Sequence, residues 1–285
     1  MNAIFNSHAA HVPTANFSQC NSSTSEKQTL ARMRLAQQQQ LQLPLKNAVV
    51  LNWEDVLAPM SFLHHRLGLQ PSRSALAEAQ ASFASDAYLQ QATFAIEEQI
   101  LELLRIASSI GPTYIVSERS MAYMEAVCAS FLPRLAIWLT YASNAMPSNQ
   151  SPQHRVHVIA APRSKFPSEM DKAAWLVNVL QTVCKNSVAL RNSPDEVHKR
   201  MLRNVETGTF GLIHVSAAEL DTFACVKAID IAPFLLPKCV QVTPVLHSTQ
   251  GGQPLSLEEF FAQLQTLQRY IVSAAAHRSA FAVKL

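Results

Sequence analysis

The chain has 285 residues, of which 48% are hydrophobic and 15% charged, and its formal net charge is +3. This length suits one large α/β domain or two small ones, and the apolar fraction with a mean hydropathy of +0.06 argues against a mainly disordered chain. The net charge is too weak to suggest a nucleic-acid binder that works by bulk charge, and the small number of glycines, six, excludes a glycine-rich nucleotide loop.

The first 45 residues differ from the rest of the chain. They are rich in Ser, Asn, Thr and His, and residues 37–40 are all Gln. Such a polar, biased segment cannot bury enough apolar surface to fold by itself, so we expect residues 1–45 to form a disordered tail. The alternative is an organelle transit peptide, because the segment has few acids, some Arg and many Ser.

Ordered structure is expected from residue 46 to residue 277, followed by a short tail at residues 278–285. Short apolar runs predict strands at residues 47–51, 113–117, 156–161, 187–190, 210–215, 226–231 and 240–246. Helical periodicity predicts helices at residues 61–69, 74–110, 120–132, 169–185, 194–205 and 256–277, with an irregular segment at residues 138–152. Gly111 is expected to cap the end of the second helix, Pro133 to stop the third, and Ser256-Leu-Glu-Glu259 to form a capping box at the start of the last.

The order of these elements predicts the fold class. Strands and helices alternate at least four times, which is typical of an α/β domain with a parallel sheet and helices on both faces. A helical insertion at residues 61–110 separates the first two strands. In such sheets the working site lies at the carboxyl ends of the strands, so the loops after Leu51, Val116 and Leu190 are the most informative.

The first of these loops carries a family resemblance. The segment Ala48-Val-Val-Leu-Asn-Trp-Glu-Asp-Val-Leu57 resembles the first motif of the haloacid-dehalogenase superfamily, a strand followed by Asp-x-Asp. It is most similar to eukaryotic proteins with Asp-Trp-Asp-Asp-Thr-Leu at this place. The resemblance implies a Rossmann-like parallel sheet.

Three further segments are similar to the remaining motifs in the same order. The second motif is a strand ending in Ser or Thr, matched by Ser117, and the third is a lysine that opens a helix, matched by Lys172 with Lys165 as the alternative. The segment Ser187-Val-Ala-Leu-Arg-Asn-Ser-Pro-Asp-Glu196 fits the spacing of the fourth motif, with Asn192 and Glu196 four residues apart.

The resemblance implies a reaction that the residues of this chain do not support. In the family, the first aspartate attacks phosphorus, the second acts as acid and base, and acids of the first and fourth motifs bind Mg²⁺. Here Asn52 replaces the nucleophile, Glu54 replaces the acid and base, and Asn192 replaces a metal-binding acid. Because a neutral amide is a very poor nucleophile, the expected function is a catalytically degenerate domain, a pseudoenzyme that binds, scaffolds or regulates.

The expected binding residues are the motif positions Asn52, Trp53, Glu54, Ser117, Lys172 and Asn192. Asn192 and Glu196 would form at most a weakened metal site, so no cofactor is expected, with Mg²⁺ implied only if hydrolysis remains. One alternative is a phosphatase-type hydrolase in which Glu54 activates water beside a non-standard metal site. Another is an unrelated α/β domain in which the segment after Leu51 is only a turn.

The sequence indicates only broad classes of partner and of cellular location. The residues indicate an unknown protein or an anionic small molecule as partner, with no nucleic acid. No uncharged apolar stretch approaches the roughly 18 residues that a membrane-spanning helix needs. The five cysteines include no Cys-x-x-Cys pair, which favours reduced thiols and an intracellular, cytoplasmic location; import into an organelle through the N-terminal segment is the alternative.

Overall fold

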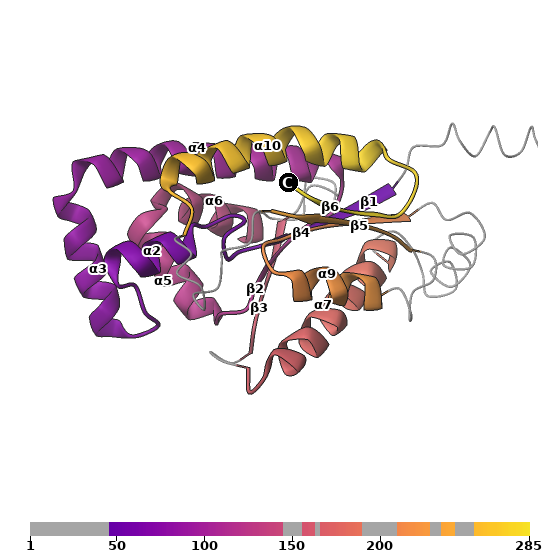
Figure 1. The fold of residues 1–285 in the computed structure, drawn as a ribbon, viewed down its shortest axis with the longest axis horizontal. Coiled ribbons are helices and arrows are strands. Elements are labelled where there is room, and N and C mark those ends of the chain that lie inside the picture. The colour runs from indigo at the N-terminus through magenta and orange to yellow at the C-terminus, as the bar shows by residue number, and fades with distance from the viewer. Residues whose placement is uncertain (1–45, 145–155, 163–165, 190–209, 229–234, 243–253) are drawn as a thin grey trace, which may run out of the picture. The chain divides into compact units, whose positions relative to one another are not determined.

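A parallel sheet forms the centre of the domain (Figure 1). The computed structural model describes residues 46–144, 156–162, 166–189, 210–228, 235–242 and 254–285. In these residues six strands pair in the order β3-β2-β1-β4-β5-β6, and every pair is parallel. The strands are β1 (Lys46–Asn52), β2 (Thr113–Ser117), β3 (Val156–Ala160), β4 (Phe210–Ser216), β5 (Leu235–Gln241) and β6 (Phe281–Lys284). The predicted parallel α/β architecture is therefore confirmed.

Helices cover both faces of this sheet (Figure 1). They are α2 (Met60–Leu67), α3 (Arg73–Ser85), α4 (Ala87–Ile110), α5 (Met121–Phe131), α6 (Pro133–Asn144), α7 (Glu169–Ala189), α9 (Glu219–Ala228) and α10 (Leu257–Ala276). Helices α4 and α10 lie together on one face, and α7 and α9 lie on the other. The helices α2, α3 and α4 between β1 and β2 form the expected helical insertion.

The alternation of side chains along β1 explains how one strand serves two cores. Val49 and Leu51 pack against α4 and α10, whereas Ala48 and Val50 pack against α7 and α9. Successive side chains of a strand point to opposite faces, so a strand covered on both sides needs an unbroken apolar run. The same alternation sends the side chain of Asn52 toward the face of α7 and α9.

The predicted helix at residues 74–110 is interrupted. Asp86 has an extended backbone and ends α3, and its side chain accepts a hydrogen bond from the N–H of Leu89, 3.1 Å away, as the N-cap of α4. An aspartate in this role stabilises a new helix start, which explains why two helices replace one. The expected end at Gly111 is confirmed, since its N–H donates to the carbonyl of Ala107.

Pro133 was expected to stop the preceding helix, and α5 does end at Phe131; Pro133 also begins the next helix, α6. Proline tolerates the first position of a helix because the N–H it lacks has no partner there. The buried carboxylate of Glu97, from α4, accepts the N–H of Leu135 at 2.8 Å and so supports this helix start. Residues 138–144 of the predicted irregular segment are consequently helical.

Two predicted strands are helical where the structure describes them. Residues 187–189 are the last turn of α7, and residues 226–228 are the last turn of α9. Short apolar runs look alike in a buried strand and at the end of a buried helix, so the pattern alone could not separate the two.

Strand β5 begins at Leu235, earlier in the chain than the predicted strand at residues 240–246. The prediction missed this start because Pro237 and Lys238 interrupt the apolar run. Lys238 is buried, and its Nζ donates to Asn47 Oδ1 at 3.0 Å and to the carbonyl of Ala274 at 2.7 Å. These acceptors make a lysine acceptable inside the core. Residues 281–284 of the expected C-terminal tail pair with β5 as β6.

The remaining predicted elements agree with the structure or lie outside it. The capping box predicted at Ser256 and Glu259 is confirmed, with both hydrogen bonds formed at the start of α10. The expected tail at residues 1–45 and the expected helix at residues 194–205 lie outside the described residues.

Candidate functional site

A cleft of about 560 Å³ lies at the carboxyl ends of β1, β2 and β4. The chain runs outward from β1 to β2 and β3 and then returns to place β4 on the other side of β1. Loops therefore diverge on either side of β1, which is where parallel sheets open a crevice for ligands. Three of the motif positions, Asn52, Glu54 and Lys172, line this cleft.

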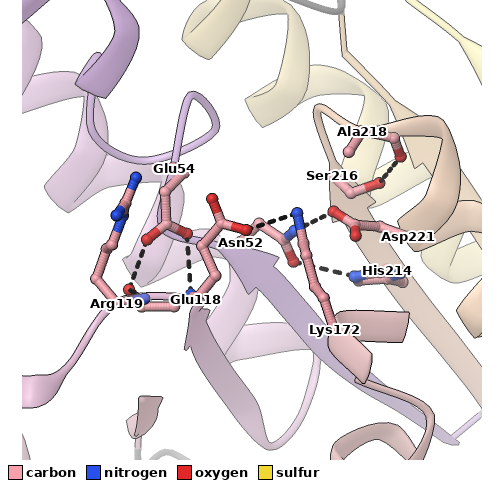
Figure 2. Close-up of polar contacts among 10 residues, drawn as sticks. Asn52, Glu54, Glu118, Arg119, Lys172, His214, Ser216, Ala218 and Asp221 are labelled. Atoms are coloured by element: carbon pink, nitrogen blue, oxygen red, sulfur yellow. Dashed lines mark hydrogen bonds and ion pairs between the residues drawn. The ribbon is translucent and has the colours of Figure 1, made fainter. Parts of the chain in front are cut away.

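The side-chain amide of Asn52 is held at both ends (Figure 2). Its Nδ2 donates to Oδ2 of Asp221, from α9, at 2.7 Å, and its Oδ1 lies 3.0 Å from Nε2 of His214, from β4. One neighbour is an acceptor and the other can donate. These surroundings match a carboxamide, which offers one donor group and one acceptor group.

His214 is uncharged in this arrangement. The ring is fully buried, and burial lowers its pKa to about 4. A neutral imidazole carries one N–H, and Nε2 must hold it to donate to Oδ1 of Asn52. Nδ1 is then the buried acceptor, and it has no hydrogen-bond partner among the described residues.

Asp221 is buried and faces both Asn52 and Lys172. Burial is the main influence and raises its pKa to about 6, while the charge of Lys172 and the hydrogen bond from Asn52 act in the opposite direction. The negative charges of Glu118 and Glu169 add to the increase. Asp221 therefore gains a proton at a pH well above the range of an ordinary aspartate.

Glu54 carries the other perturbed carboxyl group of the cleft. Its Oε1 accepts from the hydroxyl of Ser117 at 2.6 Å, and its Oε2 accepts from the backbone N–H of Glu118 at 3.3 Å. Burial, and secondarily the charge of Glu118, raise the pKa of Glu54 to about 7. The group can therefore exchange a proton near neutral pH, as a general acid or base does.

Ser117 and Lys172 are both bonded to carboxylates of this chain. Besides its bond to Glu54, Ser117 Oγ accepts the N–H of Arg119 at 3.1 Å. Lys172 Nζ lies 2.6 Å from Oε2 of Glu118. Burial works to lower the pKa of Lys172, but the surrounding carboxylates, led by Glu118 and then Asp221, outweigh it and raise the pKa.

The turn after β1 fixes the direction of these side chains. The carbonyl of Trp53 accepts the N–H groups of Leu57 and Ala58, at 3.2 and 2.9 Å, closing one helical turn. Asp55 takes a left-handed backbone conformation, with φ 56°, and its carboxylate accepts from the N–H and the hydroxyl of Ser61. Aspartate tolerates this conformation better than most residues, and the bonds to Ser61 hold it.

Trp53 was expected among the binding residues, and the structure puts it in the core instead. Its side chain is 1% exposed and packs in the cluster formed with α4 and α10. A ligand in the cleft therefore cannot stack on it in this conformation, and Trp53 acts as a packing residue.

The fourth motif, unlike the other three, is not described by the structure at its key positions. Asn192 and Glu196 lie outside the described residues, as does Lys165. The strand expected to end at Leu190 is helical as far as Ala189, so the assignment of a strand before Asn192 is wrong. On the side of β1 away from β2, the neighbouring strand is β4, which leads into Ser216-Ala-Ala-Glu-Leu-Asp221.

The sequence reading missed His214, Glu118 and Asp221. A signal for Asp221 was present, because β4 was predicted correctly and polar residues follow its end. Recognising it required knowing that β4 pairs with β1, and the pairing of strands is a tertiary property. His214 looked like one polar residue within a strand, and Glu118 like an ordinary loop residue.

The side chains that line the described part of the cleft do not fit a magnesium ion. Magnesium prefers several oxygen ligands in an octahedral arrangement, and the carboxylate of Asp221 instead accepts the amide N–H of Asn52. In the part of the chain that the structure describes, no group of three or more His, Cys, Asp or Glu could hold a metal ion.

Wider comparisons leave the family open. No protein-family model, curated protein or solved structure matches this chain. Within the described ranges, no helix has both the length and the apolar character needed to cross a membrane.

Proposed function

We propose that this chain is a catalytically degenerate domain of the haloacid-dehalogenase type, which acts by binding a ligand or partner and not by phosphoryl transfer. The observation that carries the proposal is the double hydrogen bond of Asn52 to Asp221 and His214. A nucleophilic carboxylate in place of this amide would face the Asp221 carboxylate at 2.7 Å. The neighbours of Asn52 thus favour a non-nucleophilic residue.

The grouping of the other motif residues supports the family part of the proposal. Glu54 and Lys172 line the same cleft as Asn52, and Ser117 donates to Glu54 beside it. In the family, these positions surround one phosphoryl group. Residues far apart in the chain would converge in this order only by chance in an unrelated domain.

The alternative is a hydrolase driven by Glu54. It is favoured by one specific observation, the rise of the Glu54 pKa to about 7 in a residue that lines the cleft. Such a carboxyl group could take a proton from a water molecule at neutral pH. Among the described residues, no group of three or more His, Cys, Asp or Glu could hold a metal ion to assist it.

Hydrolysis of an aryl phosphate in the presence of Mg²⁺ separates these functions. We expect no turnover by the wild-type protein and measurable turnover by the Asn52→Asp variant, which pairs a new carboxylate with Asp221. The matched control is Asn52→Ala, which removes the amide without adding a carboxylate and should remain inactive. Wild-type turnover that Glu54→Gln abolishes would instead establish the hydrolase.

A further inference from the structure

Two side chains that could hold an anion at the cleft are already bonded to carboxylates: Lys172, which lines the cleft, and Ser117, which is buried beside it. Ser117 Oγ donates to Glu54 at 2.6 Å. Lys172 Nζ contacts Oε2 of Glu118 at 2.6 Å (Figure 2). A carboxylate offers a lysine or a hydroxyl the same kind of oxygen acceptor that phosphate or sulfate offers. Each glutamate therefore takes the position of a ligand oxygen.

Both glutamates line the cleft, and Glu54 is the more deeply buried of the two. Glu118 lies between β2 and α5, and its side chain is 29% exposed. Its side chain therefore already reaches solvent. Glu54 is held by the hydroxyl of Ser117 and one backbone N–H, which also bond to a protonated carboxyl group or to an amide.

We propose that Glu54 and Glu118 act as internal anions, which keep the cleft from binding a tetrahedral oxyanion until they are displaced or lose their charge. The ligand class is a dianionic oxyanion, as a free ion or as the headgroup of an ester. This inference rests on the proposed function, because it assumes that the cleft binds a ligand.

The charges around the cleft oppose an incoming dianion at neutral pH. Glu54 and Asp55 follow β1, Glu118 and Arg119 follow β2, Lys172 opens α7 and Asp221 lies on α9; His64 and His65 of α2 and Tyr123 of α5 complete the titratable lining. Four carboxylates thus face two permanent cations among the described residues. An anion that reached Lys172 would meet more negative than positive charge.

Mild acid reduces this excess of negative charge. The pKa of Glu54 is raised to about 7 and that of Asp221 to about 6, chiefly by burial in both cases. Both groups gain protons in a range where Lys172, whose pKa is raised, keeps its charge. Affinity for an oxyanion should accordingly increase as the pH falls, because the anion-bound state takes up protons.

Sulfate is the appropriate probe, because it stays a dianion across this pH range and cannot be hydrolysed. Isothermal titration of the full chain should show an affinity about tenfold higher at about pH 5.5 than at about pH 8, from the protonation of Glu54 alone. Glu118→Gln and Glu118→Ala should each raise the affinity at about pH 8 several-fold. Lys172→Met should abolish binding at both pH values.

A charge-matched control is Glu102→Gln, which removes a surface carboxylate that pairs with Arg105 outside the cleft. It should leave sulfate affinity unchanged, so an increase equal to that of Glu118→Gln would overturn the proposal. Unchanged affinity in both Glu118 variants would overturn it as well. A pH dependence that persists unchanged in Glu54→Gln would overturn the role given to Glu54.

Two further arms distinguish the sources of the ligand. Inorganic phosphate and phenyl phosphate carry the same headgroup, and tighter binding of the ester would indicate that the cleft also contacts the organic part. These measurements report binding only. Detection of phosphatase turnover would therefore refute the proposed function. The sulfate affinities of the Glu118 and Glu54 variants would still show whether these residues oppose anion binding.

Discussion

The side-chain amide nitrogen of Asn52 lies 2.7 Å from Oδ2 of Asp221, which joins the end of the first strand to a helix 169 residues later in the chain. This hydrogen bond depends on one partner being an amide and the other a carboxylate. His214 completes the arrangement from the opposite side, with Nε2 at 3.0 Å from Asn52 Oδ1. Each of these groups is accordingly open to a test of stability as well as of function.

The Asn52→Asp variant should be less stable than the wild type at neutral pH. Two carboxylates at hydrogen-bond distance repel each other and cannot both ionise, so we expect a loss of about 1–3 kcal/mol in the free energy of unfolding. The loss should shrink as the pH falls below about 6, where Asp221 gains a proton. Urea unfolding at several pH values measures it.

The reciprocal substitution provides the control for this prediction. Combining Asn52→Asp with Asp221→Asn restores one amide and one carboxylate in exchanged positions, and it should recover much of the lost stability. If the single variant were as stable as the wild type at neutral pH, the hydrogen bond would have no energetic importance.

Glu54 should make the stability of the protein depend on pH. Its pKa is raised from 4.5 to about 7 in the folded state, so the folded chain binds this proton more tightly than the unfolded chain. The resulting stabilisation is complete below about pH 4.5 and is lost as the pH rises through about 7, by up to about 3 kcal/mol. The Glu54→Gln variant should lose this part of the slope, leaving the smaller part that comes from Asp221. Chemical unfolding of both proteins between pH 4.5 and 8 tests it.

Replacement of Lys172 by methionine should raise the pKa of Asp221 above about 6. The lysine charge is the main influence that opposes burial at this carboxyl group, and methionine keeps most of the side-chain volume without the charge. Carbon-detected NMR titration of the Asp221 carboxyl group measures the shift. The surface variant Lys284→Met, which removes a pair with Glu219, should leave the Asp221 titration unchanged.

Glu97 should be important for the start of α6 and of little importance for the cleft. Its buried carboxylate accepts the N–H of Leu135 at 2.8 Å, and Glu97→Ala leaves this N–H without that acceptor. We expect a loss of about 1–3 kcal/mol on urea unfolding, with a smaller loss for Glu97→Gln. The neighbouring Glu98→Gln, at the surface, is the matched control. Equal effects of the Glu97 and Glu98 variants would contradict the capping role.

Several elements were predictable because their signals are local. The apolar run before Asn52, the capping box at Ser256 and the glycine after α4 depend on neighbours within a few residues, and all three agree with the structure. The interruption at Asp86 was missed, since an aspartate within a helical pattern resembles a solvent-exposed helix residue. Its role as a cap depends on the direction that tertiary packing gives to α3 and α4.

The candidate site shows the same division between local sequence signals and tertiary contacts. The sequence by itself determined that Asn52, Glu54, Ser117 and Lys172 stand at strand ends or at a helix start, because residue type and hydrophobic periodicity act over short distances. Only the tertiary structure decided that β4 lies beside β1, and this pairing brings His214 and Asp221 to Asn52. It also decided that Glu118 neutralises Lys172 and that burial raises the pKa of Glu54, because charge pairing and desolvation depend on groups distant in the chain.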